Sequence, residues 1–288
     1  MPSSTKPWIV ITGCSSGIGL ACAKRFVTEG HPVIGTFRDM QRAREIENEL
    51  GDNFLGVHLE ITKEPSIAQA VKEIERLIKD YGGLLGGIVN NSGVAIGGPL
   101  KYIPMDELRY QFEVNVFGLI SFTQKLLPLL ERGPAERKRR VINMSSVSGK
   151  ISNPFLGPYA GSKHALEALS DALRLELSIH NVEVILIEPG PIQTPIWDKS
   201  IAVQEQYLHT EYAPYLRAVN HLIGVLKKNA IGPEKVANKV YVSWKKKSPK
   251  RRYLVTRQAL FTGLFIRFAP DGVKDWLNKR TLRKVPQP

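Results

Sequence analysis

A tyrosine and a lysine four residues apart, Tyr159 and Lys163, form the pair in this sequence that is best suited to proton transfer. Residues at this spacing share one face of a helix, so the ammonium can lie close to the phenol. A neighbouring positive charge stabilises phenolate and lowers the tyrosine pKa from about 10 toward neutrality, as a general acid or base requires. The alternative is a Tyr and a Lys on a solvated helix face, and the pair alone does not decide between the two.

A glycine-rich segment, Thr12-Gly-Cys-Ser-Ser-Gly-Ile-Gly19, lies between an apolar run and a segment with helical spacing. Its glycines let the backbone turn tightly and approach a pyrophosphate, whose charge the N-terminus of the following helix then stabilises. The spacing differs from the more general GxGxxG pattern. Taken alone the segment is a weak signal, because a simple turn after a strand can also carry three glycines.

Short apolar runs alternate with longer segments of helical period up to residue 187, which is the pattern of a parallel sheet covered by helices. Continuous Val, Ile and Leu runs indicate strands buried on both faces, and right-handed crossovers then build a doubly wound sheet. The expected strands are 8–12, 31–37, 54–61, 84–90, 140–144, 182–187 and 252–255, with helices beginning at 20 and covering 106–130 and 158–180. We predict an α/β fold, a single Rossmann-like sheet of seven strands flanked by helices.

Beyond residue 189 the regular pattern loosens, and aromatic residues such as Tyr207 and Tyr212 lie among polar ones. An irregular aromatic segment is typical of a lid over an apolar cleft, so we expect residues 191–232 to cover the substrate. No internal repeat or long Pro/Gly/Ser linker divides the sequence. We expect one Rossmann-type domain over residues 1–288, which includes this lid and a basic C-terminal extension at 245–288.

The composition is that of a globular protein with an uneven charge distribution, since 43% of the residues are apolar and the net charge is +13. Residues 227–288 hold 17 Lys or Arg and 3 Asp or Glu, so the basic character belongs to the tail. The two cysteines, Cys14 and Cys22, lack the partners of a metal or redox site, which leaves two reduced thiols and no metal. Without a secretion signal or an apolar run of about 18 residues, we expect a cytoplasmic protein.

Six motifs follow one another between residues 8 and 195: Thr12-Gly-Cys-Ser-Ser-Gly-Ile-Gly19, Asn90-Asn-Ser-Gly93, Asn115, Ser146, Tyr159-Ala-Gly-Ser-Lys163 and Pro189-Gly-Pro-Ile-Gln-Thr194. In this order they resemble the short-chain dehydrogenase/reductase family. Three further features make the sequence most similar to the 17β-hydroxysteroid and retinol dehydrogenase branch. These are Cys14-Ser15-Ser16, Thr36-Phe-Arg-Asp39, and a long C-terminal extension with Arg252-Tyr-Leu-Val255.

The resemblance implies four catalytic residues, which are Asn115, Ser146, Tyr159 and Lys163. Tyr159 would transfer the proton to or from the substrate oxygen, and Ser146 would hold and polarise the same oxygen. Lys163 would lower the pKa of Tyr159 and bind the nicotinamide ribose. Asn115 would anchor a water that links Lys163 to solvent, or it would bond to the backbone at a kink in its helix.

The resemblance also implies the residues that bind a dinucleotide. Glu60 stands near the adenine where the family usually has Asp, and Ser92 replaces the commoner Ala. Thr194 and the backbone of Ile192 would bind the nicotinamide carboxamide. The expected set is Gly13, Ser15, Ser16, Gly17, Ile18, Gly19, Arg38, Glu60, Ile61, Asn91, Ser92, Gly93, Tyr159, Lys163, Pro189, Gly190, Ile192 and Thr194.

The choice between NADP(H) and NAD(H) depends on the end of the second expected strand. An NAD site places a carboxylate there, about 20 residues after the glycines, whereas this sequence has Thr36. Arg38 and Ser15 offer a guanidinium and a hydroxyl that suit a 2′-phosphate, so we expect NADP(H) in preference to NAD(H). Asp39 could neutralise Arg38 or face the ribose. Arg42 either supports the phosphate or belongs to a solvated helix face.

The expected surroundings of the nicotinamide are apolar, with Val94, Ala95, Ile96 and Phe155 near its open end. Substrate contacts are expected from Ser146, Phe155, Tyr159 and Trp197. Such a lining favours a lipophilic ketone, aldehyde or alcohol, for example a steroid or retinoid, over an acidic metabolite. We therefore expect an NADP(H)-dependent oxidoreductase that transfers hydride. The alternative is a dinucleotide-binding sensor or scaffold without turnover, and the complete catalytic set favours the enzyme.

The basic tail has two interpretations. The run from Lys245 to Arg252 precedes an apolar stretch at 260–268, and such a pairing can dock on an anionic membrane surface, which suggests peripheral membrane contact through residues 245–284. The alternative is a solvated loop followed by a packed helix. No motif for specific nucleic-acid recognition accompanies the charge. The family resemblance further implies a homodimer or homotetramer built on the helices near 106–130 and 158–180.

Overall fold

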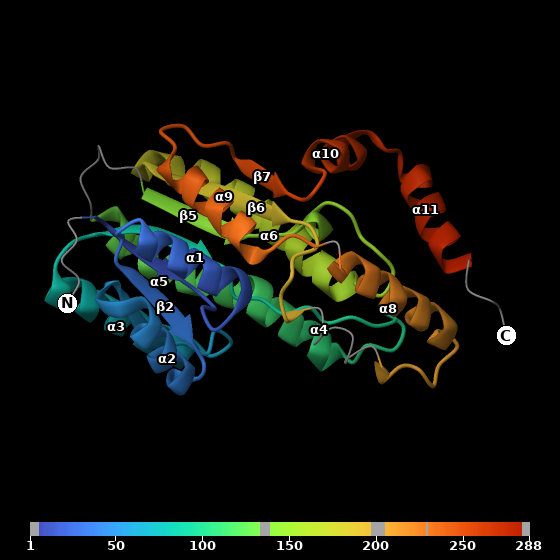
Figure 1. Ribbon diagram of the computed structural model, residues 1–288, viewed down its shortest axis with the longest axis horizontal. Coiled ribbons are helices and arrows are strands. Elements are labelled where there is room, and N and C mark those ends of the chain that lie inside the picture. The colour runs from blue at the N-terminus through green and yellow to red at the C-terminus, as the bar shows by residue number, and fades with distance from the viewer. Residues whose placement is uncertain (1–5, 133–138, 197–204, 229, 284–288) are drawn as a thin grey trace.

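The computed structural model describes residues 6–132, 139–196, 205–228 and 230–283. They form a seven-stranded parallel sheet with helices on both faces (Figure 1). The strand order is β3-β2-β1-β4-β5-β6-β7, so the winding direction reverses between β1 and β4. The strands are β1 (Trp8–Ile11), β2 (Val33–Phe37), β3 (Phe54–His58), β4 (Leu85–Asn90), β5 (Arg139–Met144), β6 (Val182–Pro189) and β7 (Arg252–Val255). All seven predicted strands are confirmed, although β3 ends earlier than the apolar run suggested.

Both faces of the sheet are apolar because alternate residues of each strand enter different cores. In β1, Trp8 packs with helices α3 and α5, whereas Ile9 packs with α1, α2 and α9 on the opposite face. The helices of these two layers are α1 (Gly17–Thr28), α2 (Met40–Leu50), α3 (Glu64–Tyr81), α5 (Gly118–Glu131), α6 (Gly157–Glu176) and α9 (Pro233–Lys245). The predicted doubly wound α/β architecture is therefore confirmed.

The helix predicted at 106–130 is divided into three pieces. A π-helical segment, Glu113–Phe117, joins α4 (Met105–Phe112) to α5. Within it, the Asn115 side chain donates to the Val94 carbonyl oxygen at 3.0 Å and accepts from the Val94 N–H at 2.9 Å. The widened turn thus fixes the loop that follows β4. Apolar periodicity continues across this turn and gives no sign of it.

The described part of residues 191–232 is more regular than the sequence predicted, because it contains α8 (Ala213–Lys228). Tyr207 and Leu216 are buried with Ile103 in a small third core. The ring of Tyr212 packs against Tyr102, with 6.0 Å between ring centres. The aromatic residues that suggested an irregular lid are therefore anchors that hold this segment against the loop before α4.

Both cysteines are free thiols inside the core. Burial raises the pKa of Cys14, and burial raises the pKa of Cys22 to about 12. Each thiol is therefore protonated at neutral pH, which makes it a poor nucleophile.

The C-terminal part places its basic and apolar segments at opposite ends of β7 (Figure 1). The run that begins at Lys245 precedes the amino end of β7, whereas α10 (Ala259–Phe268) and α11 (Asp271–Arg283) follow its carboxyl end. No residue of α10 is buried. Among the described residues, no helix has the length and apolar character needed to cross a bilayer.

Candidate active site

The glycine-rich loop after β1 is tied to the end of β4. Thr12 Oγ1 accepts a hydrogen bond from the Asn91 N–H at 2.9 Å, and the Asn91 side-chain amide donates to the Thr12 carbonyl oxygen at 2.9 Å. Gly13 has a φ of +71° and Gly17 a φ of +59°, in the left-handed region that favours glycine. A Cβ at Gly19 would lie 2.2 Å from the Gly13 carbonyl oxygen. The loop is thus a fixed turn at the N-terminus of α1.

A cavity of about 430 Å³ lies at the carboxyl edge of the sheet, where the winding reverses. The glycine-rich loop, the ends of β2 and β4, α6 and the segment after β6 all contribute to its wall. The lining residues are Gly13, Ser15, Ser16, Gly17, Ile18, Thr36, Phe37, Arg38, Leu59, Glu60, Ile61, Asn91, Ser92, Gly93, Val94, Ala95, Ile96, Tyr110, Val114, Met144, Ser145, Ser146, Tyr159, Lys163, Pro189, Gly190, Ile192, Thr194, Pro195 and Ile196.

The cavity brings together every residue expected to contact a dinucleotide except Gly19, which supports the turn from beneath. Phe155, which was expected at the substrate, does not line this cavity. Its ring packs with the third core, 5.8 Å from the centre of the Tyr212 ring, and it is absent from the cavity wall. The other predicted substrate residue, Trp197, lies outside the described residues.

Several wall residues were missed by the sequence reasoning. Phe37 and Met144 are the last residues of β2 and β5, so their position at the carboxyl ends of parallel strands could have identified them. Tyr110 and Val114 reach the cavity from α4 and the π-helical segment. Their exposure to the site depends on how this helix packs, for which the sequence carries no signal.

Ser146, Tyr159 and Lys163 converge on the β5 side of the cavity. Ser146 follows β5 and caps the short helix Val147–Gly149, where its Oγ accepts from the Ser148 N–H at 3.1 Å. Tyr159 lies in the first turn of α6, and Lys163 follows one turn later. The Lys163 Nζ is 5.8 Å from the centre of the Tyr159 ring, so the predicted shared helix face is present.

Burial shifts the pKa values of both Tyr159 and Lys163. Burial raises the pKa of Tyr159, and a hydrogen bond with Ser146 opposes that rise. Lys163 Nζ instead donates to the Met144 carbonyl oxygen at 2.8 Å. Burial lowers the pKa of Lys163 to about 8, and the nearby Glu167 carboxylate opposes the change. Burial therefore favours the neutral form of Tyr159, which can donate a proton.

Asn115 lies behind the cavity wall and is fully buried. Its Nδ2 donates to Ser162 Oγ at 3.1 Å as well as to the Val94 carbonyl oxygen. Both donors of the amide and its oxygen are therefore engaged with the protein. These contacts match the backbone-bonding role that was one of the two expectations for Asn115.

On the β2 side of the cavity, the exposed Arg38 follows the last residue of β2. Thr36 Oγ1 accepts from the Gly13 N–H at 3.3 Å, so this hydroxyl supports the glycine-rich loop. Asp39 caps α2 by accepting from the Gln41 N–H at 2.9 Å. Among the described residues, no carboxylate forms an ion pair with Arg38. The acid that could have neutralised Arg38 is therefore engaged with its own helix, and Arg38 stays available to an anion.

The sequence profile of the short chain dehydrogenase family matches residues 7–205. The chain belongs to the short-chain dehydrogenase/reductase family. It is 39% identical over 281 residues to the NADPH-dependent 3-dehydrocapnine reductase of Ornithobacterium rhinotracheale, which covers 97% of this chain and 99% of the relative. It is 34% identical over 230 residues to retinol dehydrogenase 16 of Mus musculus, which covers 75% of this chain and 70% of that protein.

A crystal structure of a short-chain dehydrogenase from Streptomyces avermitilis shares the fold of this dehydrogenase, with a TM-score of 0.76. The two sequences are 25% identical, and the comparison covers 96% of each chain. As a member of the short-chain dehydrogenase/reductase family, the protein is an oxidoreductase.

Proposed function

We propose that this dehydrogenase transfers hydride between NADP(H) and a lipophilic ketone, aldehyde or alcohol, acting chiefly as a carbonyl reductase. The observation that carries the proposal is the composition of one cavity wall. Ser146, Tyr159 and Lys163 stand on its β5 side, and the glycine-rich loop and Arg38 stand on its β2 side. Proton transfer and dinucleotide binding are thus combined in one site.

The wall residues fit NADP(H). The turn at Gly13 and Gly17 leaves backbone N–H groups at the N-terminus of α1, where a pyrophosphate would be held. Arg38 and Ser15 line the end where a 2′-phosphate would lie. Lys163 would bind the nicotinamide ribose. The NADPH dependence of the 3-dehydrocapnine reductase supports this assignment. When bound, the cofactor supplies the hydride.

The chain itself supplies the proton. The neutral phenol of Tyr159 donates a proton to the substrate oxygen as the carbonyl is reduced. Ser146 donates a hydrogen bond to the same oxygen and stabilises the negative charge that develops there. The Lys163 ammonium, below a pKa of about 8, stabilises the phenolate that remains. The reverse sequence of proton transfers oxidises an alcohol.

The substrate end of the cavity is apolar. Val94, Ala95, Ile96 and Ile196 line it together with Met144, and none of these side chains carries a charge. We therefore propose a lipophilic substrate such as a steroid or retinoid. The similarity to retinol dehydrogenase 16 supports placement near the 17β-hydroxysteroid and retinol dehydrogenase branch. The similarity to 3-dehydrocapnine reductase supports a carbonyl substrate.

We propose that residues 1–288 act as one domain and that residues 191–232 form its substrate lid. Ile192, Thr194 and Ile196 reach the cavity, and α8 follows in the same segment. We further propose a homodimer or homotetramer through the helices near 106–130 and 158–180. Phe117 and Leu169 on these helices are exposed, which supports contact with a second copy. Light scattering of the purified protein measures the mass, and a monomer would contradict this part.

For the tail we propose peripheral contact with an anionic lipid surface, centred on α10 and α11. Leu260 and Phe261 are 79% and 70% exposed, and Trp276 on α11 is also exposed. Arg267 and Arg280 provide charges that complement anionic headgroups. Sedimentation with phosphatidylcholine vesicles containing phosphatidylglycerol should capture the wild type. Phe261→Ser should reduce capture, and equal capture of both proteins would contradict the surface.

The experiment that tests the proposed activity follows NADPH absorbance in parallel with NADH across retinal, steroid ketones, aliphatic aldehydes and small ketones. We expect turnover of lipophilic carbonyls with a preference for NADPH. Tight NADPH binding without turnover across the whole panel would contradict the enzyme and favour a dinucleotide-binding sensor or scaffold.

A further inference from the structure

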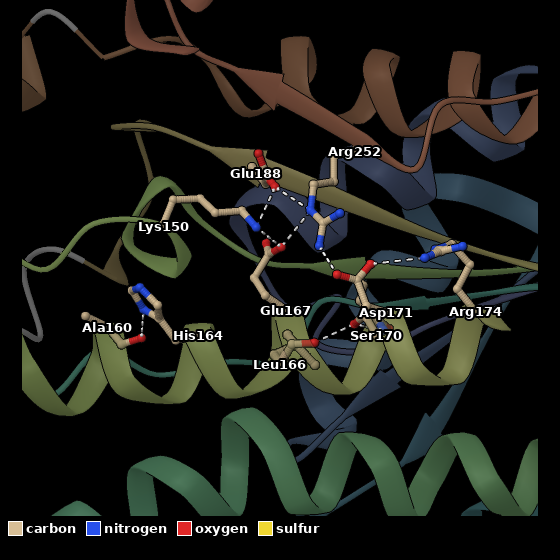
Figure 2. A network of polar contacts seen from close by, with 11 residues as sticks. Lys150, Ala160, His164, Leu166, Glu167, Ser170, Asp171, Arg174, Glu188 and Arg252 are labelled. Carbon is tan, nitrogen blue, oxygen red and sulfur yellow. Dashed lines mark hydrogen bonds and ion pairs between the residues drawn. The ribbon is translucent and has the colours of Figure 1, made fainter. Parts of the chain in front are cut away.

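An ionic cluster that takes no part in the proposed proton transfer joins α6 to β6 and β7 (Figure 2). It consists of Lys150, Glu167, Glu188 and Arg252, which we call the ionic clamp. Lys150 Nζ is 2.7 Å from Glu167 Oε2, and Arg252 Nε is 3.0 Å from the same oxygen. Glu188 Oε1 lies 3.3 Å from Arg252 Nε and 3.8 Å from Lys150 Nζ.

The two carboxylates of the clamp are buried, with Glu167 and Glu188 only 4% and 6% exposed. Burying a charge is costly unless opposite charges and hydrogen bonds compensate for the lost water. Here two cations, Lys150 and Arg252, face both buried carboxylates, so each carboxylate depends on these two residues for compensation. Such a group is sensitive to the loss of any member, because the remaining charges stay buried without a full set of partners.

Three members of the clamp are each joined to one part of the active site. Lys150 follows the short helix that Ser146 caps. Glu167 is one helical turn after Lys163 on α6. Glu188 immediately precedes Pro189 and Gly190, which line the cavity. The clamp therefore connects the three segments that carry the serine, the lysine and the loop after β6.

Arg252 brings the fourth element, β7, into this arrangement. Its Nε lies near both buried carboxylates, and its Nη2 pairs with Asp171 Oδ2 at 2.5 Å. The planar guanidinium can bridge several carboxylates at fixed angles, which a lysine ammonium cannot reproduce. From the sequence, the run from Lys245 to Arg252 was either a membrane-docking segment or a solvated loop, with a strand beginning at Arg252. The structure confirms the strand and shows the Arg252 side chain as the cross-link between β7, β6 and α6.

We propose that the ionic clamp of Lys150, Glu167, Glu188 and Arg252 positions Ser146, Lys163 and the Pro189–Gly190 turn relative to one another for NADP(H) binding and hydride transfer. The inference rests on the proposed function. The four residues are positioning residues, because they act through the segments that they hold and do not line the cavity. Small displacements of reacting groups have large effects on rate, up to about 100-fold for about 1 Å.

The clamp also makes the site sensitive to pH. Burial and the neighbouring Glu167 carboxylate raise the pKa of Glu188 to about 7, against the opposing effects of Lys150 and Arg252. Asp171, one turn after Glu167 on α6, is a further acid near Arg252, and it also pairs with Arg174. Below pH 7 the protonated Glu188 carboxyl is favoured by burial and by its hydrogen bond with Glu167. Above pH 7 the ionised Glu188 is repelled by the Glu167 carboxylate, which loosens the attachment of the Pro189–Gly190 turn.

The test compares Glu188→Gln, Arg252→Met and Arg252→Lys with the wild type. NADPH dissociation constants are measured by fluorescence from pH 5.5 to 8.5. The corrected kcat is the measured kcat divided by the fraction of chains that bind NADPH. We expect the wild-type affinity for NADPH to change near pH 7 and Glu188→Gln to lose this change. Arg252→Met should lower the corrected kcat at least about tenfold, and Arg252→Lys should recover part of it.

A matched control is Asp171→Asn, which removes an ion pair of Arg252 on the more exposed side of the cluster. It should leave the corrected kcat within about threefold of the wild type. The proposal would be overturned if NADPH affinity depended on pH in Glu188→Gln as it does in the wild type. It would also be overturned if Arg252→Met kept the corrected kcat of the wild type. Because the NADPH affinity profile needs no turnover, it tests the clamp separately, whereas an inactive wild type counts against the proposed function.

Discussion

Replacing Arg38 by alanine should separate the two nicotinamide cofactors. A guanidinium and a phosphate 4 Å apart attract by about 4 kcal/mol at an effective dielectric constant near 20. Arg38 is exposed, so solvent and salt reduce this attraction toward the 1.5–3 kcal/mol typical of a hydrogen bond to a charged group, at about physiological ionic strength. The corresponding loss of NADPH affinity is about 10- to 150-fold. NADH has no 2′-phosphate, so its affinity should change less than about twofold.

The assay is fluorescence titration of both cofactors with wild type, Arg38→Ala and the matched control Arg42→Ala. Arg42 Nη1 already pairs with Glu45 at 2.7 Å, and its Nε donates to the Ser15 carbonyl oxygen at 3.2 Å. Loss of Arg42 should therefore loosen the glycine-rich loop for both cofactors and leave their affinity ratio nearly unchanged. An unchanged ratio in Arg38→Ala, or an equal change in Arg42→Ala, would refute the assignment of Arg38 to the 2′-phosphate.

Three further variants test the site and its supports. Burial lowers the pKa of Lys163 below its unfolded value, so its ionisation opposes folding below pH 8 and this cost disappears as the pH rises toward 10.5. Lys163→Met should therefore raise the free energy of unfolding at pH 7 by about 1–3 kcal/mol in urea titrations, and lower stability at pH 7 would contradict this. The same variant should abolish turnover, because the phenolate of Tyr159 loses the cation that stabilises it. Gly19→Ala places a Cβ 2.2 Å from the Gly13 carbonyl oxygen, so it should cost about 1–3 kcal/mol in the same assay and weaken NADPH binding. Gly272→Ala, with nothing near its added Cβ, is the control, and equal stability of the two variants would contradict the packing argument. Ser146→Ala should lower kcat about 100-fold with little change in NADPH affinity in steady-state and binding assays, and a wild-type kcat would exclude its role at the substrate oxygen.

The sheet and the cavity wall were predictable because they depend on local patterns. The apolar runs gave the five inner strands, since a strand buried on both faces needs continuous apolar residues. The glycines at 13, 17 and 19 marked the turn because each has a backbone conformation or a close contact that other residues do not tolerate. Given these elements, the carboxyl edge of a parallel sheet fixes where the site lies.

The remaining features depend on contacts between distant residues. Phe155 packs against Tyr212, which the sequence could not place because α8 and the third core had not been recognised. Burial raises the pKa of Tyr159 and lowers the pKa of Lys163, and the extent of that burial depends on packing that the spacing of the two residues does not show. The pairing of Arg252 with Glu167 joins residues 85 positions apart, and a basic run in the sequence resembles a solvated one.

The measurement that most directly tests the account is deuterium transfer from NADPH deuterated at the nicotinamide C4, using a lipophilic carbonyl and mass spectrometry of the alcohol. The wild type should place one deuterium on the former carbonyl carbon. Tyr159→Phe should bind NADPH with nearly wild-type affinity and yield no deuterated alcohol, because the proton donor is gone. Deuterated alcohol formed by Tyr159→Phe at a rate close to that of the wild type would contradict the assignment of Tyr159 and the chemistry built on it.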